Sequence, residues 1–300
     1  MLKKLSAYTL ALLGLTFIFS SCKKDYESIQ SIDTQKISDY ISANSLAGMV
    51  ADSAKTGYYY QIVTQGTTGN FLKNTDSILY DGVVKGMENQ TTYFSTTATA
   101  NLGTYVGYTN YLGYNSVSYS IPAIREVMHK LKRGGTARIL LPSYLAFGKN
   151  GAGSIPSNEN IDLTITTYPD TTQAQLDDRL IQKFISSKGL SMVKDPSGVY
   201  YSISAAGSGT YPITSTATVE VSYTARLTDG TVVDSNTDLT IAINSAIKGW
   251  QTVIPGKLER GGKMRMLIPS ALAYGTSGSG TAIPANAILD FDVEILSVTQ

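Results

Sequence analysis

The chain has 300 residues, and at roughly 150 residues per domain this length favours two domains. Hydrophobic residues make up 42% and charged residues 16%, a balance that fits a globular protein and excludes a disordered or multi-span membrane chain. With 24 basic and 23 acidic residues, the sequence has no charge excess for binding nucleic acid. A single Cys and a single His, His129, cannot form a zinc site. We therefore expect no metal, no cofactor and no nucleic-acid partner.

The N-terminus has the pattern of a targeting signal. Two lysines precede an apolar run over residues 5–19, which is shorter than the roughly 20 residues needed to span a bilayer. Small residues then lead to Cys22, which resembles the lipidation site of a bacterial lipoprotein. Residues 1–21 are then a signal peptide, and acylated Cys22 anchors the protein to a membrane. Lys23 and Lys24 differ from an Asp-type inner-membrane retention signal, so we expect a place in the cell envelope, at the outer membrane.

The remainder of the chain contains an internal repeat with a period of about 140 residues. Four blocks recur in the same order: 57–62 with 198–203, 131–135 with 258–262, 141–148 with 268–275, and 155–158 with 283–286. We therefore predict a duplication. The predicted units are a signal peptide at 1–21, a tether with a short helix at 22–56, a first domain at 57–168, a connecting helix at 169–197 and a second domain at 198–300.

Periodicity predicts helices before both copies and strands within them. An apolar stripe at residues 176–185 ends at Gly189, and a shorter one at residues 37–41 follows a possible cap at Asp33 or Thr34. Residues 219–227 alternate, as do residues 289–295, where Asp290 and its acidic neighbours take the outward face. An additional Gly/Tyr-rich segment in the first copy, residues 97–116, is predicted to be a long loop or an added hairpin.

The second copy resembles the FKBP type of peptidyl-prolyl isomerase. The resemblance rests on the blocks 221–230, 233–235, 246–250, 261–263, 268–269, 272–275, 283–284 and 286–294, which occur in family order. It implies an α+β fold of two tandem FKBP-like domains, each a curled antiparallel sheet over one short helix with an apolar pocket between them. Proline-containing polypeptides are the implied partners.

The resemblance also assigns residues to that pocket. Trp250 is its floor, Asp234 is a buried polar residue beside Tyr223, and the backbone N–H of Ile247 and the hydroxyl of Tyr274 bind the substrate carbonyls. The implied catalytic set is Tyr223, Asp234, Ile247, Trp250, Tyr274 and Phe291, and the implied substrate-binding set is Val233, Leu239, Ala246 and Ile283. Val233, Ala246 and Leu239 depart from the larger or aromatic residues that the family usually has there, which implies a pocket that is wider or flatter on that side.

Physical chemistry agrees with this assignment. Rotation about an X–Pro bond has a barrier of about 18–20 kcal/mol and takes about 10–100 s unaided. The twisted amide in the transition state is less polar than the planar ground state. An apolar, water-poor pocket therefore lowers the barrier without proton transfer or covalent chemistry.

The first copy has lost these side chains. The aligned sequences place Tyr80, Phe94, Ser95, Ile124, Phe147 and Leu163 at the positions of Tyr223, Val233, Asp234, Trp250, Tyr274 and Phe291. This copy is therefore interpreted as a degenerate domain kept for binding, spacing or stability.

Three hypotheses follow. The first is a lipid-anchored prolyl isomerase that helps envelope proteins to fold. The second is a non-catalytic peptide-binding chaperone or adaptor, and the third is a structural component of the cell surface that uses the Tyr/Gly-rich segment for contact.

Overall fold

The computed structural model describes residues 27–299, apart from 97–98, 115–116 and 210–211. The predicted signal peptide and Cys22 therefore lie outside the described residues, as do the first two and the last two residues of the predicted segment 97–116. Among the described helices, none has the length and apolar character required to cross a membrane.

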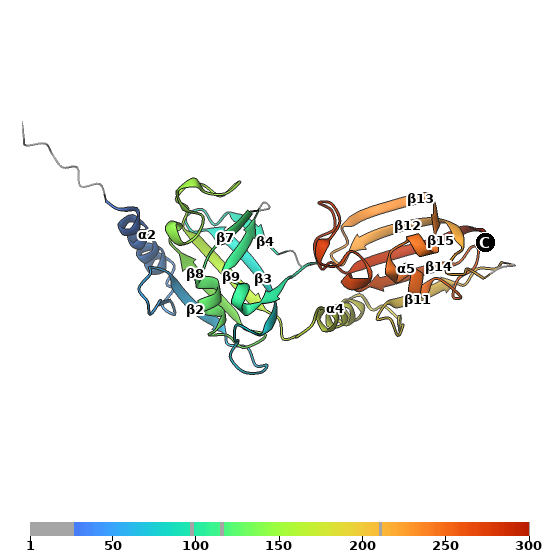
Figure 1. The fold of residues 1–300 in the computed structure, drawn as a ribbon, viewed down its shortest axis with the longest axis horizontal. Coiled ribbons are helices and arrows are strands. Elements are labelled where there is room, and N and C mark those ends of the chain that lie inside the picture. The colour runs from blue at the N-terminus through green and yellow to red at the C-terminus, as the bar shows by residue number, and fades with distance from the viewer. Residues whose placement is uncertain (1–26, 97–98, 115–116, 210–211, 300) are drawn as a thin grey trace, which may run out of the picture.

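The two copies have the same strand order. The first sheet runs β1-β2-β8-β9-β3-β4, with β5 also on β3, and the second runs β10-β11-β14-β15-β12-β13. All these pairs are antiparallel. The predicted α+β fold of two tandem copies, each built on an antiparallel sheet, is thus confirmed, and Figure 1 shows the two sheets side by side along the molecule.

The first copy contains two α-helices and nine strands among the described residues. They are α2 (Ile29–Ala43), β1 (Val50–Ala51), β2 (Tyr59–Thr64), β3 (Ser77–Gly86), β4 (Thr92–Ser95), β5 (Leu102–Tyr105), β6 (Tyr111–Tyr114), β7 (Val117–Ser120), α3 (Ala123–Met128), β8 (Thr136–Leu141) and β9 (Ile161–Thr167).

The second copy follows the same plan without the additional hairpin. Its elements are α4 (Gln173–Lys188), β10 (Val193–Lys194), β11 (Tyr200–Ala205), β12 (Thr218–Leu227), β13 (Val232–Ala242), α5 (Lys248–Val253), β14 (Lys263–Ile268) and β15 (Leu289–Thr299).

Each sheet packs its short helix against one face. In the second copy, the alternating residues of β12 and β15 turn Val219, Val221 and Phe291 toward Trp250 and Val253 of α5, and all five are buried. Gly249 lets the helix approach the sheet, because a Cβ at this position would lie 2.5 Å from a methyl carbon of Ile268. The pocket forms where this core opens toward solvent.

The longer helices α2 and α4 pack on the opposite faces of the sheets. Ile37 of α2 contacts Met87 and Leu140, and Ile181 of α4 contacts Leu267 and Ile288. The segment predicted as a connecting helix therefore also covers the second sheet, and it lies between the two sheets in Figure 1. Its predicted end is confirmed, since Gly189 is the C-cap with φ of 61°.

A buried carboxylate fixes each of these helices. Asp33 Oδ2 accepts hydrogen bonds from the backbone N–H and the hydroxyl of Ser143 at 2.9 and 2.7 Å. Asp177 Oδ2 does the same with Ser270 at 2.8 and 2.7 Å. The predicted cap at Asp33 or Thr34 is therefore wrong: Ser28 caps α2, and Asp33 lies inside the helix with a tertiary partner.

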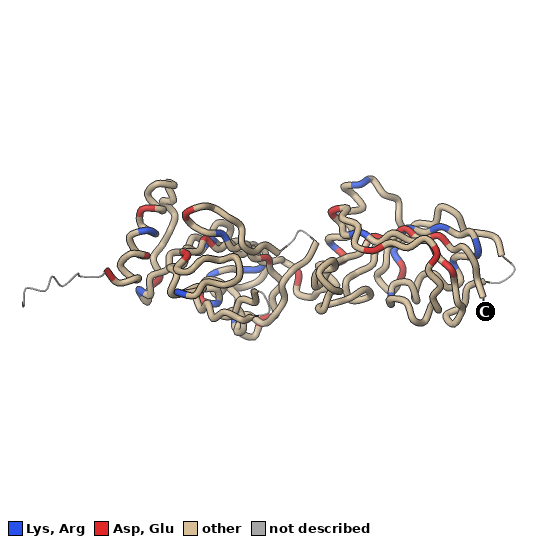
Figure 2. The backbone as a smooth tube through the Cα atoms, turned by 90° about the horizontal axis from the view of Figure 1, so that it is seen from above, with Lys and Arg blue, Asp and Glu red and all other residues tan. Residues whose placement is uncertain are grey.

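Acidic and basic residues are interspersed along both copies (Figure 2). Asp290 illustrates how they are accommodated, because it lies on the outward side of β15 as predicted yet is only 2% exposed. Its carboxylate accepts two hydrogen bonds from Arg265 at 2.8 and 2.7 Å. Burial of this charge is possible because the guanidinium pairs with both oxygens.

Asp177→Ala should lower the free energy of unfolding of the second copy by about 2–3 kcal/mol, because the buried N–H and hydroxyl of Ser270 lose their acceptor. Urea unfolding followed by the fluorescence of Trp250 measures this. Asp33→Ala makes the matched change in the first copy and should leave the Trp250 transition close to that of the parent. Equal shifts from the two variants would contradict the local role of the Asp177 contact.

Candidate functional site

The second copy has an aromatic pocket of about 160 Å³ between β12, β13 and the start of α5. Its lining residues are Tyr223, Asp234, Leu239, Ile241, Ser245, Ala246, Ile247, Trp250, Tyr274 and Phe291. All six side chains of the implied catalytic set line it, together with Leu239 and Ala246. The assignment of roles to them remains a prediction.

The two remaining residues of the implied set are not among the lining residues. Ile283 is 7% exposed and belongs to the core, and Val233 packs against that core from β13. Sequence reasoning missed Ile241 and Ser245, which also line the pocket. The alternation along β13 could have indicated Ile241, because it lies on the same face as Leu239.

Three aromatic rings form the floor and back wall of the pocket. The ring centroid of Trp250 lies 5.5 Å from that of Tyr223 and 5.4 Å from that of Phe291, with interplanar angles of 84° and 79°. Edge-to-face contacts of this kind are favourable beyond simple burial. They fix the indole, which is 3% exposed, and its buried Nε1 has no hydrogen-bond partner among the described residues.

The start of α5 provides backbone groups at the rim. The carbonyl of Ile247 accepts hydrogen bonds from the N–H groups of Trp250 and Gln251 at 3.0 and 3.3 Å. Among the described residues, the backbone N–H of Ile247 donates no such bond. The side chain of Gln251 holds the preceding loop by donating to the carbonyls of Asn244 and Ala246 at 3.1 and 2.7 Å. The rim therefore has a fixed shape and a free donor.

Asp234 departs from the expected burial. Its carboxylate accepts a hydrogen bond of 2.7 Å from the hydroxyl of Tyr223, as its place beside that residue implied, but Asp234 is exposed. The prediction of a buried acid is wrong because β13 is the edge strand of its sheet and has no neighbour to cover it. Burial of Tyr223, reinforced by Asp234, raises the pKa of the tyrosine well above its ordinary value. Tyr223 therefore stays a neutral donor throughout the physiological range.

Tyr274 stands at the mouth of the pocket. It is 37% exposed and lies in the connection between β14 and β15, just before the 3₁₀ turn Gly275–Ser277. The mouth can therefore admit a chain, whereas Trp250 is reached only from within the pocket. Among the described residues that line the pocket, Asp234 is the only carboxylate, and it is bonded to the Tyr223 hydroxyl. The arrangement therefore suits binding of an apolar group better than covalent chemistry.

Strand register corrects part of the alignment between the copies. Leu163 pairs with Val84 as Phe291 pairs with Ala225, so Gly82 occupies the position of Tyr223, and Tyr80 does not. The assignments of Phe94 and Ser95, both in β4, are each wrong by one residue.

Phe94 pairs with Val84 as Asp234 pairs with Ala225, so Phe94 occupies the position of Asp234, and neither Phe94 at Val233 nor Ser95 at Asp234 holds. Leu163, Ile124 and Phe147 keep their assigned places. Ile124 does so because its N–H bonds the carbonyl of Ile121 as Trp250 bonds Ile247.

The hairpin β6–β7 fills the corresponding place in the first copy. It is inserted between the 3₁₀ turn Val106–Tyr108 and α3, where the second copy has its pocket rim. Tyr119 and Tyr114 contact the ring of Phe147 with centroids 4.9 and 6.1 Å apart, and Tyr114 also contacts Phe94 at 6.5 Å. Of the two alternatives predicted for residues 97–116, a long loop or an added hairpin, the structure has the hairpin, although its strands are Tyr111–Tyr114 and Val117–Ser120. Its tyrosines occupy the space in which the second copy has a pocket.

The fold and the aromatic pocket define a class that comparison with known proteins identifies. A family model described as FKBP-type peptidyl-prolyl cis-trans isomerase matches residues 209–296. The FK506-binding protein of Neisseria meningitidis serogroup C is 41% identical over 88 residues, which cover 27% of this chain and 80% of that protein. The chain belongs to the FKBP-type peptidyl-prolyl isomerase family.

Longer relatives match over the same part of the chain. The probable FKBP-type peptidyl-prolyl cis-trans isomerase of Haemophilus influenzae is 39% identical over 116 residues, covering 37% of this chain and 47% of that protein. The isomerase FkpA of Aeromonas hydrophila is 42% identical over 108 residues, covering 35% and 39%. The chain thus spans less than half the length of these two relatives. The crystal structure of FkpA from Escherichia coli is 32% identical with a TM-score of 0.37, covering 42% of this chain and 59% of that one.

Because Trp250 is the only tryptophan and is 3% exposed, its emission should lie at shorter wavelength than that of an exposed indole, and acrylamide should quench it weakly. Excitation near the red edge of tyrosine absorption isolates this signal from the 20 tyrosines. Trp250→Phe serves as the blank. Quenching as efficient as that of free tryptophan would contradict the position of the indole at the pocket floor.

Proposed function

We propose that the second copy catalyses cis–trans isomerisation of X–Pro bonds in polypeptides. The observation that carries the proposal is the pocket of Trp250, Tyr223 and Phe291, whose rings form an apolar enclosure of about 160 Å³ beside a free backbone donor at Ile247. This volume suits a proline ring with part of the preceding residue. The catalytic and substrate-binding roles of the lining residues are part of this proposal.

The proposed mechanism uses desolvation and hydrogen bonding. The proline ring enters against Trp250, and its carbonyl neighbours receive hydrogen bonds from the Ile247 N–H and the Tyr274 hydroxyl. Twisting the amide reduces its polarity, so the apolar pocket stabilises the transition state more than the planar ground state. Proton transfer is not required, and the neutral Tyr223 keeps its hydrogen bond to Asp234 throughout.

The first copy is proposed to have no isomerisation site of its own. Gly82 and Phe94 replace the Tyr223–Asp234 pair, and Tyr114 and Tyr119 occupy the pocket space. A cavity filled by the chain's own aromatic side chains offers no place for a proline ring unless the hairpin moves.

Tyr274→Phe should lower kcat/KM for isomerisation of a short prolyl peptide about 5- to 30-fold, corresponding to about 1–2 kcal/mol for one lost hydrogen bond. Trp250→Leu should lower it further, because the pocket loses its flat floor. A protease-coupled assay on the full chain measures both.

Phe147→Leu alters the corresponding residue of the first copy and is the matched control, expected to keep the parent rate. Two results would contradict the proposal: a parent rate equal to the uncatalysed rate, or equal losses from the Phe147 and Tyr274 variants. Peptide binding without turnover would favour a non-catalytic chaperone or adaptor.

We also propose that the protein acts in a bacterial cell envelope, attached by acyl chains on Cys22. The support is the sequence pattern of residues 1–22 together with the position of the first described helix, which begins at Ile29. Only a few residues would then separate the lipid from the folded protein. The outer membrane is the proposed site because Lys23 and Lys24 follow the cysteine.

Cys22→Ala should abolish acylation and release the protein from the membrane fraction, because the proposed anchor depends on this thiol. Metabolic labelling with a palmitate analogue and a high-salt wash of membranes measure the two effects. Cys22→Ala protein that stays with the washed membranes would contradict the lipoprotein proposal.

A further inference from the structure

The loop that carries Tyr274 is held at its start by the helix between the two copies. This loop, residues 269–288, connects β14 to β15. Ser270 donates two hydrogen bonds to Asp177 of α4, and both residues are 1% exposed. The position of α4 therefore fixes the chain four residues before Tyr274.

The end of the same loop is held by the first copy. The side chain of Asn286 donates to the backbone carbonyl of Asn101 at 3.1 Å, and this bond is buried. The backbone N–H of Asn286 donates to the carbonyl of Gly275 at 2.8 Å. Asn286 thus connects Asn101 to Gly275, the residue that directly follows Tyr274.

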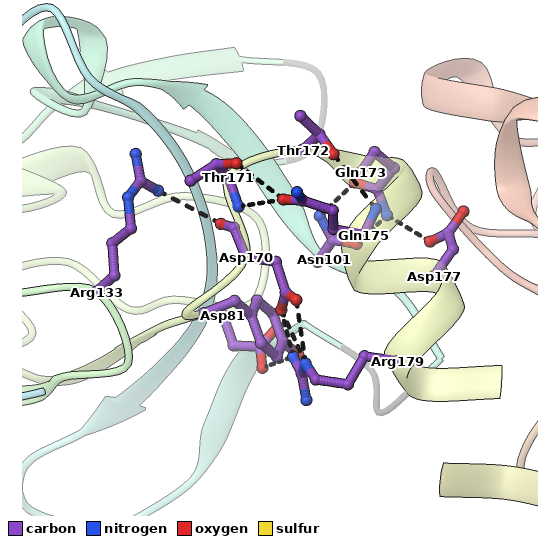
Figure 3. Close-up of polar contacts among 11 residues, drawn as sticks. Asp81, Asn101, Arg133, Asp170, Thr171, Thr172, Gln173, Gln175, Asp177 and Arg179 are labelled. Atoms are coloured by element: carbon purple, nitrogen blue, oxygen red, sulfur yellow. Dashed lines mark hydrogen bonds and ion pairs between the residues drawn. The ribbon is translucent and has the colours of Figure 1, made fainter. Parts of the chain in front are cut away.

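The side chain of Asn101 is connected through Gln173 to Asp177, the residue that holds the start of the loop. Its amide and that of Gln173 exchange two hydrogen bonds, of 3.0 and 2.9 Å, and Gln173 donates a third, of 2.7 Å, to the free oxygen of Asp177. Figure 3 shows these three residues in sequence, from the first copy to α4. Asn101 is only 4% exposed, so water competes weakly for these bonds.

Further polar contacts fix the segment that precedes α4 to the first copy and to the helix (Figure 3). Arg133 donates to the carbonyls of Asp170 and Ser77, and the Asp170 carboxylate pairs with Arg179 of the helix at 2.6 Å. The segment before Gln173 is therefore bonded both to Arg133 of the first copy and to Arg179 of α4, which fixes the position of Gln173 beside Asn101.

The first copy serves as an internal comparison. It has the equivalent contact between Asp33 and Ser143, but the residue four positions before Asp33 is Ile29, which is 37% exposed. In the second copy, the residue four positions before Asp177 is Gln173, which bonds Asn101 of the first copy. The hydrogen bonds from the helix to another domain, made by Gln173 and Asn101, are therefore a feature of the second copy, in which the pocket is open.

We propose that Asn101 and Gln173 are positioning residues through which the first copy holds the loop of Tyr274 in place for isomerisation. This inference rests on the proposed function of the second copy. Holding both ends of the loop restricts the positions available to the Tyr274 hydroxyl before substrate arrives, and that restriction reduces the entropic cost of reaching the transition state. The degenerate copy thus contributes to catalysis without a site of its own.

The test measures amide hydrogen exchange and kcat/KM on the full chain with Asn101→Ala, Gln173→Ala and the double variant. Exchange within residues 270–286 should accelerate in each, while exchange in β12 and β15 stays at the parent level. The expected loss in kcat/KM is about fivefold, typical of coupling between sites. Because the two amides act as a pair, the double variant should lose no more than Gln173→Ala alone.

Gln175→Ala is the matched control, since this glutamine is on the same helical turn but its side chain accepts, among the described residues, only from Thr171. If Gln173→Ala matches this control in both measurements, the proposal is overturned. Faster exchange throughout β12 and β15 also overturns it, because the amides would then stabilise the domain as a whole. If the parent lacks isomerase activity, the proposed function fails, and the exchange pattern alone still decides whether the loop is held in this way.

Discussion

The contact between a buried helical carboxylate and a serine is the constraint on which the rest of each copy depends. Asp33 and Asp177 accept both the N–H and the hydroxyl of a serine that directly follows the proline after a central strand. Burial raises the pKa of Asp177, while its hydrogen bonds oppose that rise. The helix, the sheet and the loop are thereby fixed to one another, and the loop of the second copy carries Tyr274.

The pocket follows from this frame and from the packing of aromatic rings. Trp250, Tyr223 and Phe291 support one another edge to face, so the floor stays flat without a ligand. The edge position of β13 leaves Asp234 in solvent, and its bond to Tyr223 keeps that hydroxyl oriented. An apolar enclosure with polar groups only at its rim is suited to a reaction whose transition state is less polar than its ground state.

The two copies show how one fold can lose a pocket and keep its core. The ring of Phe94 lies beside Gly82, because a Cβ at Gly82 would be in van der Waals contact with it at 3.8 Å. The inserted hairpin then covers Phe147 with Tyr114 and Tyr119. The core residues of the sheet are unaffected, which explains why the repeat remains recognisable. What the first copy retains is a surface against the second copy, on which Asn101 contacts Asn286 at the end of the Tyr274 loop directly. Asn101 reaches the start of that loop through Gln173 and Asp177.

The duplication, the α+β fold and most of the pocket lining could be predicted from the sequence alone, because alternation, turn residues and local motifs are properties of neighbouring residues. Tertiary structure decided what depends on contacts between distant segments. Strand pairing showed that Gly82 and not Tyr80 matches Tyr223, because loops of different length hide the register. Position at a sheet edge exposed Asp234, which a motif cannot reveal. The partners of Asp33 and Asn101 are likewise separated from them by many residues, so only the folded chain brings them together.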